Sequence, residues 1–151
     1  MRSHDDMSRV TPQMRNFAER VIAFETRGNK SSETKTQTAY LVSEKLRPRL
    51  ATLMGSTGFR ALLSRSLALA HPEAAWLRAV HVKADGSLEG LDALEAQVDP
   101  DEMFGGCVVL LAQLLGLLVA FVGENLTFQL VRDVWPKLSL HDLDFGKGAK
   151  P

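Results

Sequence analysis

Side chains that commonly bind metals are few in this chain and are widely spaced. Its four histidines are His4, His71, His81 and His141. No two of them stand at the i, i+4 spacing or the other short spacings that zinc and di-iron sites use. None lies within an apolar helical face, where the axial ligand of a haem would be expected. The sequence therefore predicts no metal site and no cofactor.

Candidate nucleophiles are equally poorly placed. The chain has no G-x-S-x-G segment, and the Gly-containing segment 55–58 lacks the lysine of a phosphate-binding loop. Cys107, the only cysteine, lies within an apolar run, where a thiol behaves as a small hydrophobe rather than a nucleophile. One cysteine cannot form an intramolecular disulfide, which favours a reducing compartment. We therefore expect a cytoplasmic protein that is not an enzyme and has no catalytic residues.

The remaining candidate site is basic. Arg47 and Arg49 lie on one expected helix, and Arg60 and Arg65 follow on the next. The order of helix, Gly-containing turn and helix across residues 45–65 loosely resembles a helix-turn-helix. Such a face could bind a polyanion such as DNA, or an acidic protein partner. The second helix offers few side chains that could read bases, so an ordinary solvated face is the favoured interpretation and polyanion binding the alternative.

The longest apolar run offers two structural interpretations. From Met103 to Gly123 the chain has twenty-one residues without a charge, and Gln113 is the only strongly polar side chain among them. This length permits a membrane span. The flanks, however, carry acidic residues instead of the basic and aromatic residues that mark membrane interfaces. We therefore expect a buried core helix over 103–122, with membrane association or insertion of 103–123 as the alternative.

Signals at both ends delimit this helix. Asp99 supplies an N-cap and Pro100 a proline at the first helical position. Gly123 is expected to end the helix, and Glu124 follows directly. The position of Glu124 beside the apolar run makes it a candidate for a partly buried, perturbed acid. Its alternative role is to cap the next helix together with Asn125.

Small side chains form a strip along the same helix. Ala112, Gly116 and Ala120 recur every four residues, so they share one helical face. A smooth strip of this kind lets another helix approach closely, either from this chain or from a second copy. These three residues are therefore candidates for helix packing or self-association.

The other segments are amphipathic. A first helix is expected over 12–28, because Thr11 supplies an N-cap, Pro12 a proline at the first helical position, and apolar residues then recur at helical spacing. In the second helix a kink or break is expected near Arg47, because a proline follows it. Alternating apolar residues around Asp85-Gly86 indicate a small β-hairpin near 79–89.

Together these signals predict an all-α fold. We expect a compact bundle of about five to seven helices around the central hydrophobic helix 103–122. Residues 11–140 would form a single helical domain, between a flexible N-terminus at 1–10 and a flexible C-terminal tail at 141–151. This layout is similar in outline to Bcl-2-like and colicin pore-forming folds. The likeness covers no motif, so it transfers neither a function nor functional residues.

The charge of the chain limits the classes of partner that the protein is expected to bind. The chain has eighteen basic and eighteen acidic residues, so no global field attracts nucleic acid or anionic membranes. Residues 1–83 carry fourteen Lys/Arg and seven Asp/Glu, whereas residues 84–151 carry four and eleven. The function expected first is that of a protein–protein interaction or regulatory module that self-associates. Membrane association through 103–123 and nucleic-acid binding through 45–65 are the alternatives.

Overall fold

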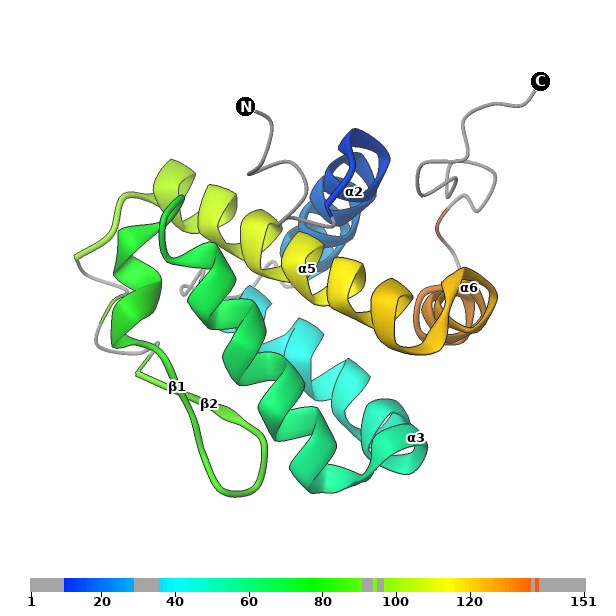
Figure 1. The fold of residues 1–151 in the computed structure, drawn as a ribbon. Coiled ribbons are helices and arrows are strands. Elements are labelled where there is room, and N and C mark those ends of the chain that lie inside the picture. Colours follow the sequence, from blue (N-terminus) through cyan, green and yellow to red (C-terminus); the bar gives the residue numbers. More distant parts are fainter. Residues whose placement is uncertain (1–9, 29–35, 91–93, 95–96, 137, 139–151) are drawn as a thin grey trace, which may run out of the picture.

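The structure is a computed structural model that describes residues 10–28, 36–90, 94, 97–136 and 138. These residues hold four α-helices, one 3-10 helix and two short strands: α2 (Pro12–Gly28), α3 (Thr36–Ala70), η1 (Ala75–Ala79), β1 (His81–Val82), β2 (Leu88–Glu89), α5 (Pro100–Val122) and α6 (Glu124–Val134). The predicted all-α character is confirmed (Figure 1). The described helices number four, fewer than the five to seven expected, partly because the two helical segments on either side of Gly55 are counted together as α3. The expected terminal segments 1–10 and 141–151 lie outside the described residues, apart from Val10.

Both predicted proline starts form as expected. Thr11 Oγ1 accepts a hydrogen bond from the Met14 backbone N–H at 3.1 Å, so it caps the helix that begins at Pro12. At α5, Asp99 Oδ2 accepts from the Asp101 N–H at 3.1 Å, and Pro100 is the first helical residue. In each case the cap satisfies a backbone donor that the helix leaves unpaired.

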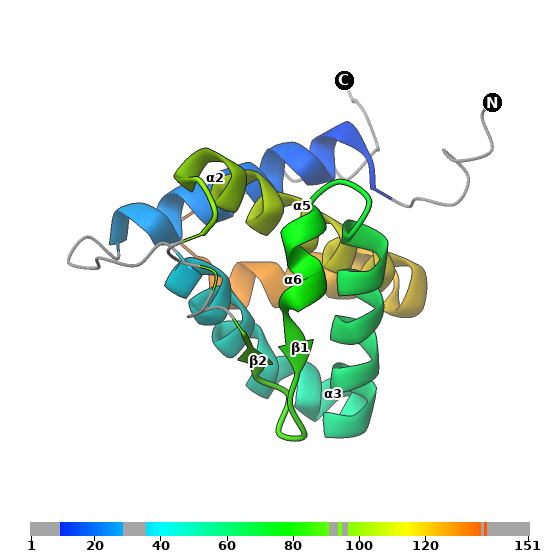
Figure 2. The ribbon, with the colours of Figure 1, turned by 90° about the vertical axis from the view of Figure 1, so that its left-hand side faces the viewer.

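Helix α3 is interrupted at Gly55, where the Gly-containing turn between two helices was expected, and not near Arg47. The expected break near Arg47 is wrong, because α3 remains helical through Pro48. The backbone leaves the helical region at Gly55, with φ 84° and ψ 159°. Proline removes one hydrogen bond but keeps a helical φ, whereas glycine alone readily adopts a positive φ with this ψ. Figures 1 and 2 both show the two halves of α3 folding back from this bend.

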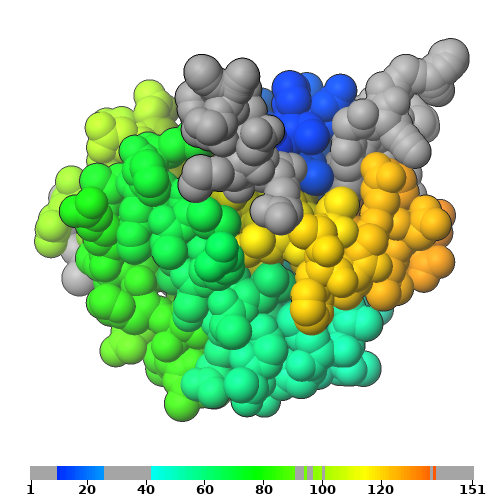
Figure 3. Space-filling model, viewed as in Figure 1, coloured from blue at the N-terminus to red at the C-terminus, as the bar shows by residue number. Residues whose placement is uncertain are grey.

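Helix α5 lies at the centre of the fold. It packs mainly against α3 and α2 and more lightly against α6. Every residue from 106 to 116 is buried, and Figure 3 shows only part of α5 at the surface between α3 and α6. The segment Asp101–Val122 is long and apolar enough to cross a membrane, but 67% of its most apolar window is buried within the protein. The apolar run is therefore a core helix in this structure.

The predicted hairpin is present. β1 and β2 pair antiparallel, with His81 opposite Glu89, and Gly86 adopts a φ of 91° in the turn. The Ser87 side chain and then its backbone N–H donate to Asp85 Oδ1, at 2.6 and 2.9 Å. These hydrogen bonds, with a smaller contribution from the Lys83 charge, hold the pKa of Asp85 below its ordinary value.

The buried carboxylate of Glu25 joins three segments of the chain. The Glu25 side chain on α2 is 8% exposed, and its Oε2 accepts from Lys45 Nζ at 2.5 Å and from Trp135 Nε1 at 2.8 Å. Lys45 lies on α3 and Trp135 directly follows α6. A buried carboxylate is tolerated when its oxygens are hydrogen-bonded, and here the bonds hold α3 and the end of α6 to α2.

Candidate functional site

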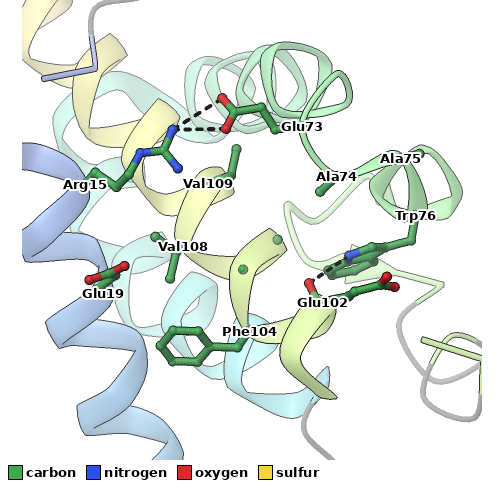
Figure 4. A pocket seen from close by; sticks show the side chains of 12 residues that line it. Arg15, Glu19, Glu73, Ala74, Ala75, Trp76, Glu102, Phe104, Val108 and Val109 are labelled. Carbon is green, nitrogen blue, oxygen red and sulfur yellow. Dashed lines mark hydrogen bonds and ion pairs between the residues drawn. The ribbon is translucent and has the colours of Figure 1, made fainter. Parts of the chain in front are cut away.

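A groove of about 470 Å³ lies between α2, the segment around η1 and the first turns of α5. Figure 4 shows its side chains converging from these three parts of the chain. It is lined by Arg15, Glu19, Glu73, Ala74, Ala75, Trp76, Glu102, Phe104, Gly105, Gly106, Val108 and Val109. Its volume falls within the range of about 300–1,000 Å³ that is typical of ligand sites. A second cavity, beside Cys107, measures about 20 Å³ and has room for no more than a water molecule.

Two adjacent glycines of α5 form the floor of the groove. At Gly106 a Cβ atom would come within 2.3 Å of Trp76 Cζ2, so the indole lies directly against the helix backbone. At Gly105 a Cβ atom would meet nothing within 4 Å. Because Gly106 has no side chain, the Trp76 indole can pack against α5 and form a wall of the groove. Because Gly105 has none either, the floor of the groove stays open beside it.

Aromatic rings stand on both sides of this floor. Trp76 Nε1 donates to the backbone oxygen of Glu102 at 3.2 Å, which ties η1 to the first turn of α5. Phe104 is 37% exposed although it is a large apolar side chain. Figure 4 shows Phe104 on the side of Glu19 and Trp76 on the side of Glu102. The groove thus combines apolar rings with carboxylates.

One ion pair lies along the groove. Arg15 Nη2 donates to both carboxylate oxygens of Glu73, at 3.1 and 3.3 Å (Figure 4). The two side chains are 40% and 45% exposed, so solvent screens this pair strongly. Glu19 and Glu102 are exposed and form no ion pair with the described residues. With three carboxylates and one guanidinium, the described lining of the groove carries an excess of two negative charges when all are ionised.

The four arginines of the predicted basic face have separate surroundings. Arg47 is ion-paired with Glu44 and donates to the Asp85 backbone oxygen at 3.0 Å. Arg49 lies 3.3 Å from an Asp133 carboxylate oxygen on α6. The list is completed by Arg60, which is partly buried, and Arg65, which is exposed. Arg47 therefore joins α3 to the hairpin, whereas the solvent-exposed Arg49–Asp133 pair holds α3 to α6 only weakly.

The other predicted residues lie away from the groove. Ala112 and Gly116 are buried inside the fold, and Ala120 is exposed. The first two thus pack within the chain, whereas only Ala120 reaches the surface. Glu124 is partly buried and begins α6. The expected side-chain cap of α6 is absent: its N-cap is Gly123, which has no side chain to accept a hydrogen bond.

Within the described part of the chain, no group of three or more His, Cys, Asp and Glu side chains could hold a metal ion. His71 is partly buried directly after α3, and His81 is exposed on β1. His4 and His141 lie outside the described residues. Among the described residues, the groove lining contains no histidine, cysteine, serine or lysine, so the chemistry of these residues is that of carboxylates, one guanidinium and aromatic rings.

Sequence reasoning missed the groove. The signal that could have found it is the pair Gly105-Gly106 inside a strong helical pattern, because adjacent glycines lower helix propensity and often mark a close approach. Trp76 offered a second signal, since a large aromatic outside the amphipathic helices needs an apolar surface. Their juxtaposition required knowledge of the tertiary fold.

Comparison with protein-family models, with curated proteins and with solved structures gave no match to this chain. The similarity in outline to Bcl-2-like and colicin pore-forming folds therefore gains no support from these comparisons. Function has to be argued from the groove and from the surface of the molecule.

Proposed function

We propose that this protein is a non-catalytic interaction module and that the groove beside Trp76 is where it binds a partner protein. The observation that carries this proposal is an open, preformed groove of about 470 Å³ whose lining combines exposed carboxylates with two aromatic rings. Convergent polar groups on an apolar floor are typical of binding sites. A cytoplasmic setting is part of the proposal, supported by the single cysteine.

The experiment tests whether a side chain placed at Gly105 blocks binding in the groove. Gly105→Leu places a side chain in the open groove, whereas Gly105→Ala adds only a methyl group at the same position. Each variant and the wild-type protein would be immobilised and exposed to extract from the source cells. We expect proteins captured by the wild type and by Gly105→Ala to be lost with Gly105→Leu. An identical set of captured proteins for all three would contradict the proposal.

Self-association is a second part of the proposal, and its support lies at the junction of α5 and α6. Phe121 is 66% exposed and Leu126 is 37% exposed, on either side of Gly123. Exposed apolar side chains of this size favour contact with another protein surface. We expect Phe121→Ser to lower the oligomeric fraction measured by sedimentation equilibrium. A wild-type protein that is monomeric at high micromolar concentration would contradict self-association.

Membrane association remains a second candidate function, because Asp101–Val122 has the length and apolar composition of a span. Insertion would require α5 to leave its contacts with α2 and α3. Sedimentation with lipid vesicles and resistance to carbonate extraction would favour it. Recovery of all the protein in the supernatant would exclude membrane association under those conditions. Nucleic-acid binding through 45–65 has weaker support, since Arg47 is engaged with Glu44 and the hairpin and Arg60 is partly buried.

A further inference from the structure

The distribution of charge in the groove indicates what kind of group it binds. Arg15 spans both carboxylate oxygens of Glu73, so these two charges largely offset each other. Glu19 and Glu102 have no such partner among the described residues. Two uncompensated carboxylates in one groove attract a cation and disfavour an anion.

The rings add a second preference. Trp76 and Phe104 stand on opposite sides of the floor, each on the side of one of the uncompensated carboxylates (Figure 4). A cation near an aromatic face is stabilised by the ring quadrupole. Between the rings, the open position at Gly105 leaves space for an alkyl chain along the helix backbone. Long basic side chains combine an apolar stem with a charged end in this way.

We propose that the groove binds a lysine or arginine side chain of a partner protein, which deepens the proposed function and rests on it. The alkyl stem lies over Gly105 between the two rings, and the cationic end meets Glu19 or Glu102. The exposed Arg15–Glu73 pair offers further donors and acceptors to the backbone of the partner. A free amine has no peptide backbone that could form hydrogen bonds with Arg15 and Glu73. This difference favours a protein as the source of the cation.

Capped amino acids test this directly. Nα-acetyl-lysine-N-methylamide and its arginine counterpart would be titrated into the 15N-labelled protein. The Trp76 indole N–H and the Gly105 and Gly106 amides would report binding. We expect both compounds to shift these resonances. The norleucine counterpart, which has the alkyl stem without the charge, should bind about tenfold more weakly.

Variants distinguish the contribution of the carboxylate charges from that of the open space in the groove. The double variant Glu19→Gln with Glu102→Gln should lose the preference for the lysine compound over the norleucine compound. Glu89→Gln is the matched control, because Glu89 is an exposed carboxylate of β2 that does not line the groove. It should keep the full preference. Gly105→Leu should abolish the shifts from every compound, and its melting curve would verify that it folds.

The outcomes distinguish a failure of the cation-binding inference from a failure of the proposed function. Equal binding of the lysine and norleucine compounds at the groove would overturn recognition of a cation while leaving the groove as a binding site. Shifts that persist in Gly105→Leu would place binding elsewhere and overturn the proposed function as well. Tighter binding of the free diamine cadaverine than of the lysine compound would overturn a partner protein as the source. No shift with any compound at high millimolar concentration would overturn this inference, while the capture experiment still tests the proposed function.

Discussion

The two ends of α5 both leave a phenylalanine at the surface, yet their surroundings differ. At the N-terminal end, Phe104 lies beside a groove that has walls from α2 and η1 and carries several carboxylates. At the C-terminal end, Phe121 is more exposed, at 66%, and precedes the sharp turn to α6 at Gly123. Figure 1 shows this second end as an outer corner of the molecule.

The glycines at the two ends of α5 are also required for different physical reasons. Gly106 has no room for a side chain because Trp76 lies against it. Gly123 has open space around it but a φ of 95° and a ψ of 163°, which side chains rarely allow. One glycine is therefore required by packing and the other by backbone conformation. The comparison teaches that the walls and polar groups added by neighbouring segments, and not the exposed ring alone, distinguish the groove at the N-terminal end from the open surface at Phe121.

Substituting Gly106 should have the largest effect. We expect Gly106→Leu to lower the free energy of unfolding by about 3 kcal/mol, because the side chain would displace the Trp76 indole and break its bond to the Glu102 carbonyl. Urea unfolding followed by circular dichroism measures the change. An unchanged unfolding midpoint would mean that Trp76 is not held against α5.

A substitution at Gly123, where α5 turns into α6, should lower the stability through backbone strain rather than through packing. Gly123→Ala is expected to cost about 1–3 kcal/mol through backbone strain alone, since nothing lies within 4 Å of the added methyl group. Thermal and urea unfolding would both report it. If the variant were as stable as the wild type, α5 and α6 would have to join through a different backbone conformation.

Gly105 should respond with the opposite sign. Its backbone is helical and its added methyl group meets no atom within 4 Å, so Gly105→Ala should raise the free energy of unfolding by about 0.5–1 kcal/mol. The same urea experiment gives the measurement. Destabilisation would show that the floor of the groove is filled. Together with Gly106→Leu, this variant tests whether adjacent glycines truly face different surroundings.

The smallest effect is expected at the exposed phenylalanine of the corner. Phe121→Ser should change the free energy of unfolding by no more than about 0.5 kcal/mol, because most of the ring already contacts solvent. The measurement needs dilute protein, so that loss of self-association does not contribute. A large loss of stability in the monomer would mean that Phe121 belongs to the core.

Local signals identified most of the fold because they act within a few residues. Thr11 and Asp99 cap their helices as predicted, the turn at Asp85-Gly86 joins two strands, and Gly123 separates α5 from α6. The turn expected in the Gly-containing segment 55–58 forms at Gly55, whereas the break expected near Arg47 is absent because proline keeps a helical φ. The missed groove depends on residues from distant segments, so no local pattern could place them together.

The sequence by itself determined that the apolar run from Met103 to Gly123 would be a helix with an acidic start and a glycine end, because capping and helix propensity are local. Only the tertiary structure decided what surrounds that helix. Packing of α2 and α3 buries residues 106–116, while η1 brings Trp76 against Gly106 and opens the groove beside Gly105. Those contacts join residues far apart in the chain, and their geometry follows from side-chain packing that no short pattern encodes.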